Sequence, residues 1–373
     1  MKHILIIASY GPSLINFRFS LIKKLLSKNY KVSVASPIDD FSKNLQKLLR
    51  DIGVKIYFIK LSRTGINFFS DFKTLLEIYK LIKKINPNII ISYTIKPVIY
   101  TGLVLNFFRK ITFYPLITGL GSSFIEINLI KKFLLRYLII KLYRLGLKNS
   151  SRVIFQNKDD KSLFLKLKII NQKKLFIVNG SGVSLRHFPF TKLPVKPVFL
   201  MISRLLVNKG IREYIEAAKI VRSRFPSVKF KLVGKFEKNP SSITLNELKL
   251  LKKDRNIEYL GEVKKIKSVL RSSKFYVLPS YREGTPRSTL EALATGRPII
   301  TTNVPGCRET VVHKKNGFLV PPKNATALAQ AMIKLLETDD KAVCFMARES
   351  FLLAKKKYEI SKVNNSMLNI MKL

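Results

Sequence analysis

Short apolar runs alternate with longer amphipathic stretches along most of the chain. The runs HILII (3–7), KVSVAS (31–36) and NIIISY (88–93) are largely apolar, which is typical of strands buried on both faces of a parallel sheet. The segments between such runs, for example residues 72–85, carry apolar residues at helical spacing. This alternation predicts repeated β-α-β units in which helices cover a parallel sheet.

The same alternation restarts after a proline-bearing stretch at residues 188–197. Beyond it, strands are expected at KPVFLMISRL (196–205), VKFKLVG (228–234) and KFYVLPS (274–280), with helices between them. A chain of 373 residues is also longer than one ordinary hydrophobic core requires. We therefore predict two α/β domains joined near residues 188–197.

The stretch SYREGTPRSTLEALATGRPIITT (280–302) combines a strand exit, a glycine-containing loop, a short helix and a second strand. Thr285 is expected to cap the helix, Pro286 to occupy its first position, and Gly296 to end it. The free backbone N–H groups and the positive end of the helix dipole favour a bound anion, most naturally a phosphate. This stretch is therefore our candidate anion site.

Charged side chains near this stretch indicate a ligand that carries both phosphates and hydroxyl groups. Glu283 and Glu291 bracket the anion site, and because carboxylates are poor phosphate ligands we expect them to contact hydroxyls. Arg204 and Lys209 lie in another βα loop, where two cations can grip a diphosphate. Arg287 opposes the helix dipole on the first turn, so we expect it to contact the anion. A nucleotide sugar has both kinds of group.

The pattern Glu283-x7-Glu291 resembles a motif of the retaining glycosyltransferases of family 4, and S-R-L-x-x-x-K-G (203–210) resembles the Arg/Lys pair that neutralises the nucleotide diphosphate in that family. The resemblance covers nearly the whole chain and implies the GT-B fold, an α/β architecture of two Rossmann-like domains facing across a cleft. Through SLINFR, SYTIKP and TGLGSSF it is closest to enzymes that extend lipid-linked oligosaccharides, O-antigens or capsules, including the N-acetylgalactosaminyltransferase of bacterial N-glycan assembly.

The resemblance also assigns tasks to the two domains. Residues 1–190 would bind the acceptor, with the C-terminal helix 359–373 packing back on them, and residues 191–358 would bind the nucleotide sugar. Glu283 would hold the transferred sugar, and Arg204 and Lys209 would complete the catalytic set by stabilising the leaving diphosphate. The implied donor-binding residues are Arg204, Lys209, Gly234, Glu283, Gly284, Thr285, Pro286, Arg287 and Glu291, the last of which would hold the ribose.

The implied reaction moves an N-acetylhexosamine or hexose from a UDP-sugar to an undecaprenyl-diphosphate-linked saccharide with retention of configuration. The departing phosphate can itself take the proton of the acceptor hydroxyl. We expect no metal and no cofactor besides the UDP-sugar, because the sequence has no Asp-x-Asp motif and no His cluster with metal-ligand spacing.

Candidate acceptor-binding residues follow the strands of the first domain, at the carboxyl edge where open α/β sheets bind ligands. They are Gly11, Asn16, Arg18, Thr94, Lys96, Gly119 and Gly121. Many members of the family have a His beside the sugar, and Thr94 or Lys96 of SYTIKP is expected to replace it. The Gly-x-Gly at 119–121 fits a tight turn and a substrate contact equally well.

The charge is strongly one-sided, with 69 Lys and Arg against 23 Asp and Glu and a net charge of +46. Such an excess attracts polyanions or an anionic membrane, although biased codon usage in an AT-rich genome would also raise the Lys content. The segment LIKKFLLRYLIIKLYRLGLK (129–148) has cations and no acid. It fits a core helix with one solvated face, and equally an amphipathic helix lying on anionic lipid.

Two other classes of function were compared with the transferase. A basic nucleic-acid-binding protein would need a recognisable reading module, which this sequence lacks, so no nucleic-acid partner is expected. A GT-B epimerase would share the fold and would release free sugar without acceptor, whereas the intact set of Glu283, Glu291, Arg204 and Lys209 argues against a degenerate, non-catalytic binding domain. Two isolated cysteines favour a reducing compartment, and we expect a cytoplasmic protein at the inner face of the bacterial membrane.

Overall fold

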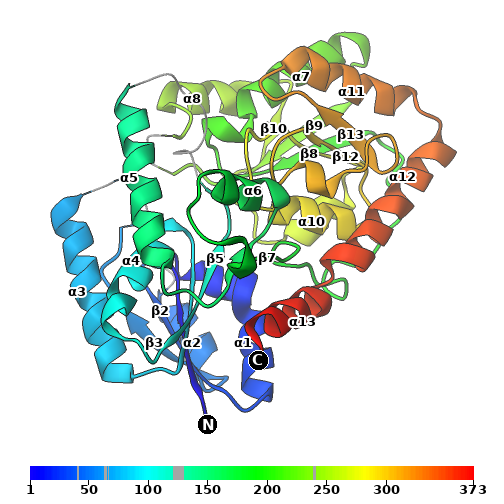
Figure 1. Ribbon diagram of the computed structural model, residues 1–373. Coiled ribbons are helices and arrows are strands. Elements are labelled where there is room, and N and C mark those ends of the chain that lie inside the picture. The colour runs from blue at the N-terminus through cyan, green and yellow to red at the C-terminus, as the bar shows by residue number, and fades with distance from the viewer. Residues whose placement is uncertain (40–41, 63–64, 66, 121–129, 238–240) are drawn as a thin grey trace. The chain divides into compact units, whose positions relative to one another are not determined.

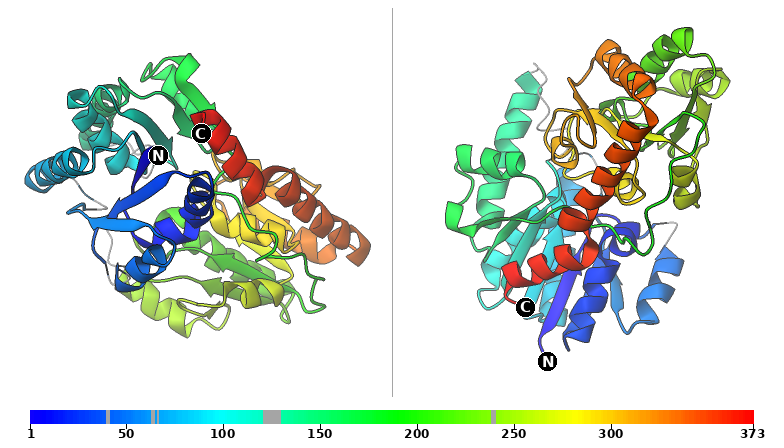
Figure 2. Two further views of the ribbon diagram at one scale, coloured as in Figure 1. Left: turned by 90° about the horizontal axis from the view of Figure 1, so that it is seen from below. Right: turned by 90° about the vertical axis from the view of Figure 1, so that its right-hand side faces the viewer.

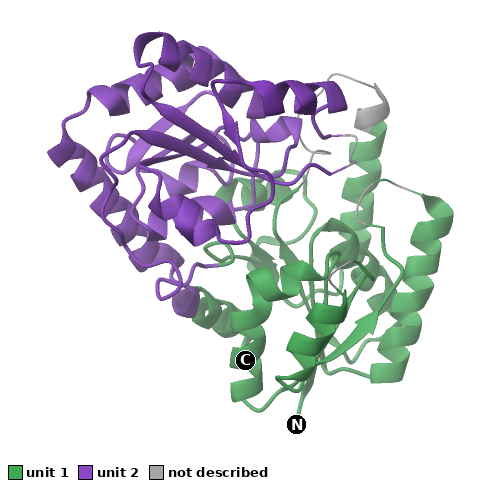
Figure 3. Ribbon diagram, turned by 180° about the vertical axis from the view of Figure 1, so that it is seen from behind, with its two compact units in different colours: residues 1–181, 363–373 green, residues 182–362 purple. Residues whose placement is uncertain are grey.

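The computed structural model describes residues 1–39, 42–62, 65, 67–120, 130–237 and 241–373. The chain divides into two compact units, shown in Figure 3. Unit 1 comprises Met1–Ser181 and Val363–Leu373, and unit 2 comprises Gly182–Lys362. The sequence-based boundaries at 190/191 and 358/359 lie nine and four residues from the divisions at 181/182 and 362/363.

Unit 1 is built on a seven-stranded sheet in which all the pairings are parallel. Its strands are β1 (His3–Ile7), β2 (Lys31–Ser36), β3 (Lys55–Phe58), β4 (Ile89–Tyr93), β5 (Thr112–Ile117), β6 (Val153–Phe155) and β7 (Leu175–Ile177), in the order β3-β2-β1-β4-β5-β6-β7. The central strand β1 is almost completely buried because its apolar side chains meet helices on both faces of the sheet.

The helices of unit 1 form two layers. The helices α1 (Phe19–Ser27) and α2 (Ser42–Arg50) share a core with Met367, Leu368 and Met371 of α13 (Ile360–Met371). Residues of α3 (Phe68–Ile85), α4 (Ile95–Val104), α5 (Ile130–Leu147) and α6 (Lys158–Lys166) share the other core. This division follows from right-handed crossovers, because the chain moves outward from β1 in one direction and then in the other. Figures 1 and 2 show the red C-terminal helix beside the dark-blue α1.

Helix α3 begins earlier than its amphipathic pattern predicted. We expected a start at residue 72, whereas the helix starts at Phe68. Asn67 caps it, since its side chain accepts a hydrogen bond from the backbone N–H of Ser70 at 3.0 Å. Two of the additional residues at the start of the helix, Phe68 and Phe69, are exposed aromatics, which do not follow a pattern based on burial.

Unit 2 repeats the architecture with six parallel strands in the order β10-β9-β8-β11-β12-β13. They are β8 (Val198–Ile202), β9 (Lys229–Val233), β10 (Glu258–Tyr259), β11 (Phe275–Leu278), β12 (Ile299–Thr302) and β13 (Gly317–Val320). The helices are α7 (Ile211–Arg224), α8 (Leu245–Lys253), α9 (Ile266–Arg271), α10 (Arg287–Ala294), α11 (Ala325–Glu337) and α12 (Asp340–Leu353). Two Rossmann-like parallel sheets confirm the predicted fold class.

Within the described ranges, we find no helix that is both long and apolar enough to cross a bilayer.

Candidate functional site

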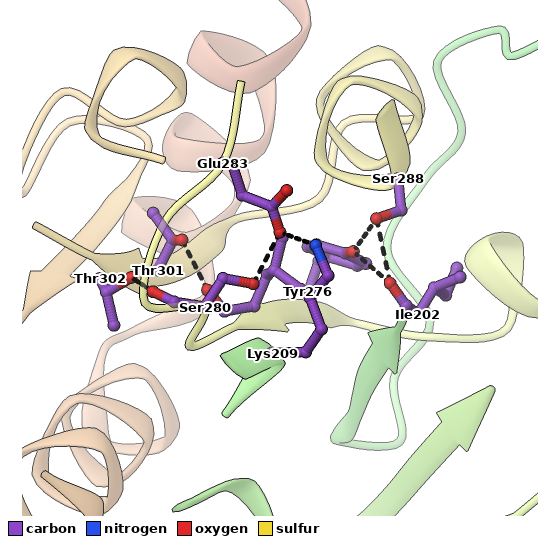
Figure 4. Close-up of polar contacts among 9 residues, drawn as sticks. Ile202, Lys209, Tyr276, Ser280, Glu283, Ser288, Thr301 and Thr302 are labelled. Atoms are coloured by element: carbon purple, nitrogen blue, oxygen red, sulfur yellow. Dashed lines mark hydrogen bonds and ion pairs between the residues drawn. The ribbon is translucent and has the colours of Figure 1, made fainter. Parts of the chain in front are cut away.

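Three adjacent strands of unit 2 deliver the candidate donor residues to one edge of the sheet. The strands β8, β11 and β12 are neighbours and parallel, so the loops that follow them meet at their carboxyl ends. The loop after β8 carries Arg204 and Lys209, and the loop after β11 carries Glu283 and leads into α10. Figure 4 shows the side chains at this edge.

Lys209 and Glu283 point toward one another and form an ion pair between Nζ and Oε1 (Figure 4). Ser280 donates a hydrogen bond to the same carboxylate oxygen at 2.8 Å. The two charged side chains are only 16% and 13% exposed, so solvent screens the pair weakly. The structure thus unites a cation suited to phosphate with a carboxylate suited to a sugar hydroxyl.

Backbone contacts fix the loop after β8 against the loop after β11. The 3-10 turn Val207–Lys209 is followed by Gly210 with φ 76, and a Cβ at this position would overlap the carbonyl oxygen of Pro279. The backbone N–H of Tyr281 donates to the carbonyl of Asn208 at 2.9 Å. Lys209 is therefore positioned relative to Glu283 by main-chain packing as well as by its own charge.

The loop after β12 packs against the backbone of Glu283, a contact that the sequence did not predict. The N–H of Glu283 donates to the carbonyl of Pro305 at 3.0 Å. Gly306 has φ 81, and a Cβ there would lie 2.6 Å from the carbonyl oxygen of Gly284 and closer still to that of Glu283. The Pro-Gly pair after an apolar strand was the available signal. Cys307 follows, and its burial, with the nearby charge of Glu283, raises the pKa of the thiol to about 12.

The start of α10 differs from the sequence-based expectation by one residue. Pro286 is the N-cap with φ −71 and ψ 117, and Arg287 is the first helical residue. Thr285 does not cap the helix, because its hydroxyl donates to the carbonyl of Gly284 at 2.9 Å. The proline ring fixes only φ, which suits both positions, so ψ decides where the helix begins. Gly296, with φ 75, follows the helix end as expected.

Arg287 and Glu291 form a second pair, one helical turn apart on α10. Nε of Arg287 lies 2.9 Å from Oε1 of Glu291, and both side chains are largely buried. Burial raises the pKa of Glu291, while the Arg287 guanidinium opposes that rise. We expected Arg287 to contact the anion; the structure shows its guanidinium bonded to the carboxylate expected to hold the ribose.

The first turn of α10 is also tied to the end of β8, through residues that sequence reasoning did not identify. The hydroxyls of Tyr276 and Ser288 are 2.6 Å apart, and Ser288 donates to the carbonyl of Ile202 at 3.0 Å (Figure 4). Burial of the Tyr276 hydroxyl raises its pKa well above the usual range. This network fixes the helix N-terminus against the strand that leads to Arg204.

Arg204 and Gly234 lie at the exits of β8 and β9. Arg204 forms an ion pair with Glu237 at 3.3 Å, in a more exposed setting than the Lys209–Glu283 pair. A Cβ on Gly234 would overlap the carbonyl oxygen of Ser203, so this glycine lets the two strand exits touch. The structure therefore explains Gly234 by its packing beneath the Arg204 loop.

Three candidate acceptor residues of unit 1 lie after β1. Gly11 is buried, and a Cβ there would lie 2.9 Å from Cδ2 of Leu45. Asn16 is exposed on the π-helix Leu14–Arg18. Arg18 is buried with its guanidinium 5.1 Å from the centre of the Tyr93 ring. The first βα loop thus presents one exposed amide and one enclosed cation.

The other candidate acceptor residues follow β4 and β5. Thr94 has the unusual φ of 73 and donates to the hydroxyl of Ser9 at 2.7 Å, so the exits of β4 and β1 are joined. Lys96 forms an ion pair with the buried Asp71 at 2.7 Å. Gly119 has φ 132, and Gly121 lies outside the described residues.

No group of three or more His, Cys, Asp or Glu side chains is arranged to hold a metal ion among the residues that the structure describes.

Comparison with known proteins agrees with this geometry. A family model described as "Glycosyl transferase 4-like" matches residues 3–157, and one described as "Glycosyl transferases group 1" matches residues 196–338. The chain is 31% identical over 355 residues to the N,N'-diacetylbacillosaminyl-diphospho-undecaprenol alpha-1,3-N-acetylgalactosaminyltransferase of Campylobacter jejuni, covering 91% of this chain and 90% of that one. It is 27% identical to the UDP-Gal:alpha-D-GlcNAc-diphosphoundecaprenol alpha-1,3-galactosyltransferase of Escherichia coli, covering 80% and 78% of the two chains.

Among solved structures, Anabaena HepE in complex with UDP and glucose matches with a TM-score of 0.79 at 16% identity, and the match covers all of both chains. At that identity the likeness establishes the GT-B fold alone. The family rests on the 31% identity that extends over nearly the whole chain, together with the two family matches. This protein therefore belongs to the group 1 glycosyltransferases of family 4.

Proposed function

We propose that this glycosyltransferase moves an N-acetylhexosamine or a hexose from a UDP-sugar to an undecaprenyl-diphosphate-linked saccharide, with retention of configuration. The observation that carries the proposal is the shielded Lys209–Glu283 pair beside the N-terminus of α10. The names of the two bacterial relatives support the acceptor, since both act on diphospho-undecaprenol saccharides, and the second uses a UDP-sugar.

The donor site works by electrostatics and orientation. Lys209, Arg204 and the backbone N–H groups at the start of α10 stabilise the charge that develops on the leaving β-phosphate. Glu283 accepts hydrogen bonds from hydroxyls of the transferred sugar, and Glu291 accepts them from the ribose. The departing phosphate takes the proton of the acceptor hydroxyl on the same face of the sugar, so a hydrolase-type pair of carboxylates is not required.

The acceptor side of the proposal rests on the loops of unit 1. Arg18, Thr94 and Lys96 follow adjacent parallel strands, so they lie along one sheet edge with Gly11, Asn16 and Gly119. Lys96 is charge-paired with Asp71, which favours the neighbouring Thr94 as the replacement for the family's histidine. A strained φ at a strand exit, as at Thr94, is common where a binding site demands a particular direction of the chain.

A matrix of UDP-sugars against a polyprenyl-diphosphate-linked sugar tests the proposed function. We expect transfer from one or a few donors, with the anomeric configuration retained when the product is analysed by NMR. Glu283→Gln should abolish most of the transfer while saturable UDP binding persists. Release of free sugar without acceptor would favour an epimerase, and failure to bind UDP at all would refute a donor site in unit 2.

The Arg287–Glu291 pair predicts a specific dependence on pH. Because burial raises the pKa of Glu291 and Arg287 opposes the rise, Arg287→Met should move that pKa further upward. The carboxylate then takes up a proton at higher pH, so as the pH is lowered the UDP affinity of the variant should begin to fall at a higher pH than that of the wild type. Calorimetric titration of both proteins over a series of pH values measures this difference. Glu291→Gln has no carboxyl group to titrate at this position, so it should bind UDP weakly and with an affinity that this residue no longer makes pH-dependent. If the UDP affinities of Arg287→Met and the wild type changed with pH in parallel, Glu291 would not be the titrating group of the donor site.

We also propose that the protein works on the cytoplasmic face of the membrane, through the outer face of α5. In the described part of this helix, Ile139, Ile140, Tyr143 and Leu147 are buried in the core. The opposite face carries exposed apolar and cationic side chains, namely Leu134, Tyr137, Leu138, Lys141, Arg144 and Leu145. One face therefore fits the core-helix alternative and the other has the composition of a surface that adsorbs on anionic lipid.

A further inference from the structure

The first turns of α3 expose an unusual amount of aromatic surface. Phe68, Phe69 and Phe72 are 78%, 85% and 62% exposed, and Leu76 continues the same stripe. The opposite face of the helix is ordinary core, with Ile78 and Ile82 fully buried. We call Phe68, Phe69, Phe72 and Leu76 the aromatic patch. Single exposed apolar residues are common on proteins, but a contiguous cluster marks a surface that binds something.

The aromatic patch lies at the functional edge of unit 1. In a parallel sheet each crossover helix runs opposite to the strands, so the N-termini of α3 and α5 both lie at the carboxyl edge. Figure 1 shows α3, α4 and α5 side by side along one face of the sheet. The helices α4 and α5 are held in backbone contact, since a Cβ on Gly102 would overlap the carbonyl of Gly146. The aromatic patch and the exposed face of α5 therefore belong to one rigid layer.

The exposed charged side chains of α3 and of the described part of α5 all have the same sign. Lys73 and Lys80 are exposed on α3, and Lys141 and Arg144 are exposed on α5. The two acids of α3 already have partners: Asp71 is buried against Lys96, and the half-buried Glu77 accepts a hydrogen bond from the backbone N–H of Lys60 at the surface. Exposed rings surrounded by cations fit a partner with an apolar interior and an anionic surface, which describes an anionic bilayer.

A second copy of the chain fits this surface less well. A symmetric dimer through the patch would bring Lys73 and Lys80 of each copy toward those of the other, in a protein with a net charge of +46. The two acids of α3, Asp71 and Glu77, are already bonded to Lys96 and to the backbone of Lys60, so the helix offers little negative charge to offset that repulsion. Lipid phosphates supply the missing negative charge.

We propose that the aromatic patch inserts into the acyl boundary of an anionic bilayer, while the cations of α3 and α5 adsorb on the lipid phosphates. The inference rests on the proposed function, because it places the carboxyl edge of the unit 1 sheet at the membrane where a polyprenol-linked acceptor resides. It extends that function by making α3, rather than α5, the element that enters the hydrocarbon. Interfacial helices of this kind bury their apolar face about 5–10 Å deep.

The chain contains no tryptophan, so one introduced tryptophan reports its own position without background. Phe69→Trp places the reporter in the aromatic patch, and Phe345→Trp on α12 of unit 2 is the matched control, since Phe345 is also an exposed phenylalanine, at 53%. With vesicles of phosphatidylglycerol and phosphatidylcholine, we expect the emission of Phe69→Trp to shift to the blue and to be quenched by lipids brominated on their acyl chains. The emission of Phe345→Trp should not change.

Binding measurements separate insertion from adsorption. Phe68→Ser, Phe69→Ser and Phe72→Ser combined should lower the partition coefficient at least about tenfold, because burial of a single phenylalanine ring is already on that scale. The residual binding of this variant should be released by salt. Lys141→Glu and Arg144→Glu combined should instead weaken the salt-sensitive part of the binding and leave the wavelength shift of a Phe69→Trp reporter at high lipid concentration.

Several outcomes would overturn the insertion. Unchanged emission of Phe69→Trp on vesicles that still pellet the protein would assign binding to another surface. A shift that depends on protein concentration without lipid would indicate a second copy, and a shift with single-stranded RNA but not with vesicles would indicate nucleic acid. Transfer to a short-chain, water-soluble acceptor is measured in parallel. The triple Ser variant should retain it, so a failed insertion and a failed transferase assignment are distinguishable.

Discussion

Replacing Lys209 by alanine is expected to lower kcat at least about a hundredfold, the usual cost of removing one preorganised group that stabilises transition-state charge. The ammonium group is shielded, bonded to Glu283 and positioned by the contact between Gly210 and Pro279. Its loss removes positive charge from the leaving phosphate and also removes the ion pair of the Glu283 carboxylate. Arg204→Ala is also expected to lower kcat.

The measurement is kcat at saturating donor, with UDP affinity determined separately to distinguish binding from chemistry. Lys219→Ala is the matched control, because Lys219 lies on α7, is 58% exposed and makes only a 4.0 Å pair with Asp254. A surface pair of this kind contributes little, so kcat should stay within about twofold of the wild type. If Lys209→Ala retained wild-type turnover, Lys209 would not belong to the donor site.

Gly306→Ala is expected to lower activity nearly as much as Lys209→Ala, although glycine has no functional side chain. Its Cβ would collide with the backbone of Glu283 and Gly284, so the loop that holds the sugar-binding carboxylate must move. Displacement of a reacting group by about 1 Å can cost on the order of a hundredfold in rate. We expect kcat/KM to fall by that order, while UDP, which we propose is bound by the β8 loop and α10, should lose less affinity.

Gly261→Ala separates the steric effect from backbone strain. Gly261 also has a positive φ, 64, but a Cβ there meets nothing within 4 Å. Both variants should lose about 1–2 kcal/mol of folding stability for placing alanine in the left-handed region, seen as a lower Tm. Only Gly306→Ala should lose activity. Equal activity in the two variants would show that the loop after β12 does not position Glu283.

The sequence by itself determined the fold class and most of the donor-site candidates. Alternating apolar strands and amphipathic helices are local patterns that record burial, so two parallel α/β sheets could be predicted from them. The stretch 280–302 was recognisable because a strand exit, a helix N-terminus and two carboxylates are all encoded within a short segment. The resemblance to family 4 added roles that the pattern alone could not assign.

Only the tertiary structure decided which loops meet. Lys209 and Glu283 lie 74 positions apart in the chain, and their pairing depends on β8 and β11 being neighbours. The support from Gly306 likewise depends on β12 lying beside β11. The choice of Pro286 over Thr285 as the cap depends on a ψ angle that no residue type fixes. These are properties of neighbours in space, and a one-dimensional pattern does not contain them.

Exposure was the other property that the sequence left open. Phe68, Phe69 and Phe72 look like core residues by type, and a pattern that equates apolar with buried started the helix at residue 72. The structure turns these rings to solvent because Asn67 begins the helix earlier and the core below α3 is already filled by residues such as Ile78 and Ile82. An apolar side chain is buried only if the core beneath its helix has unfilled volume for it. That volume is defined only by the folded structure.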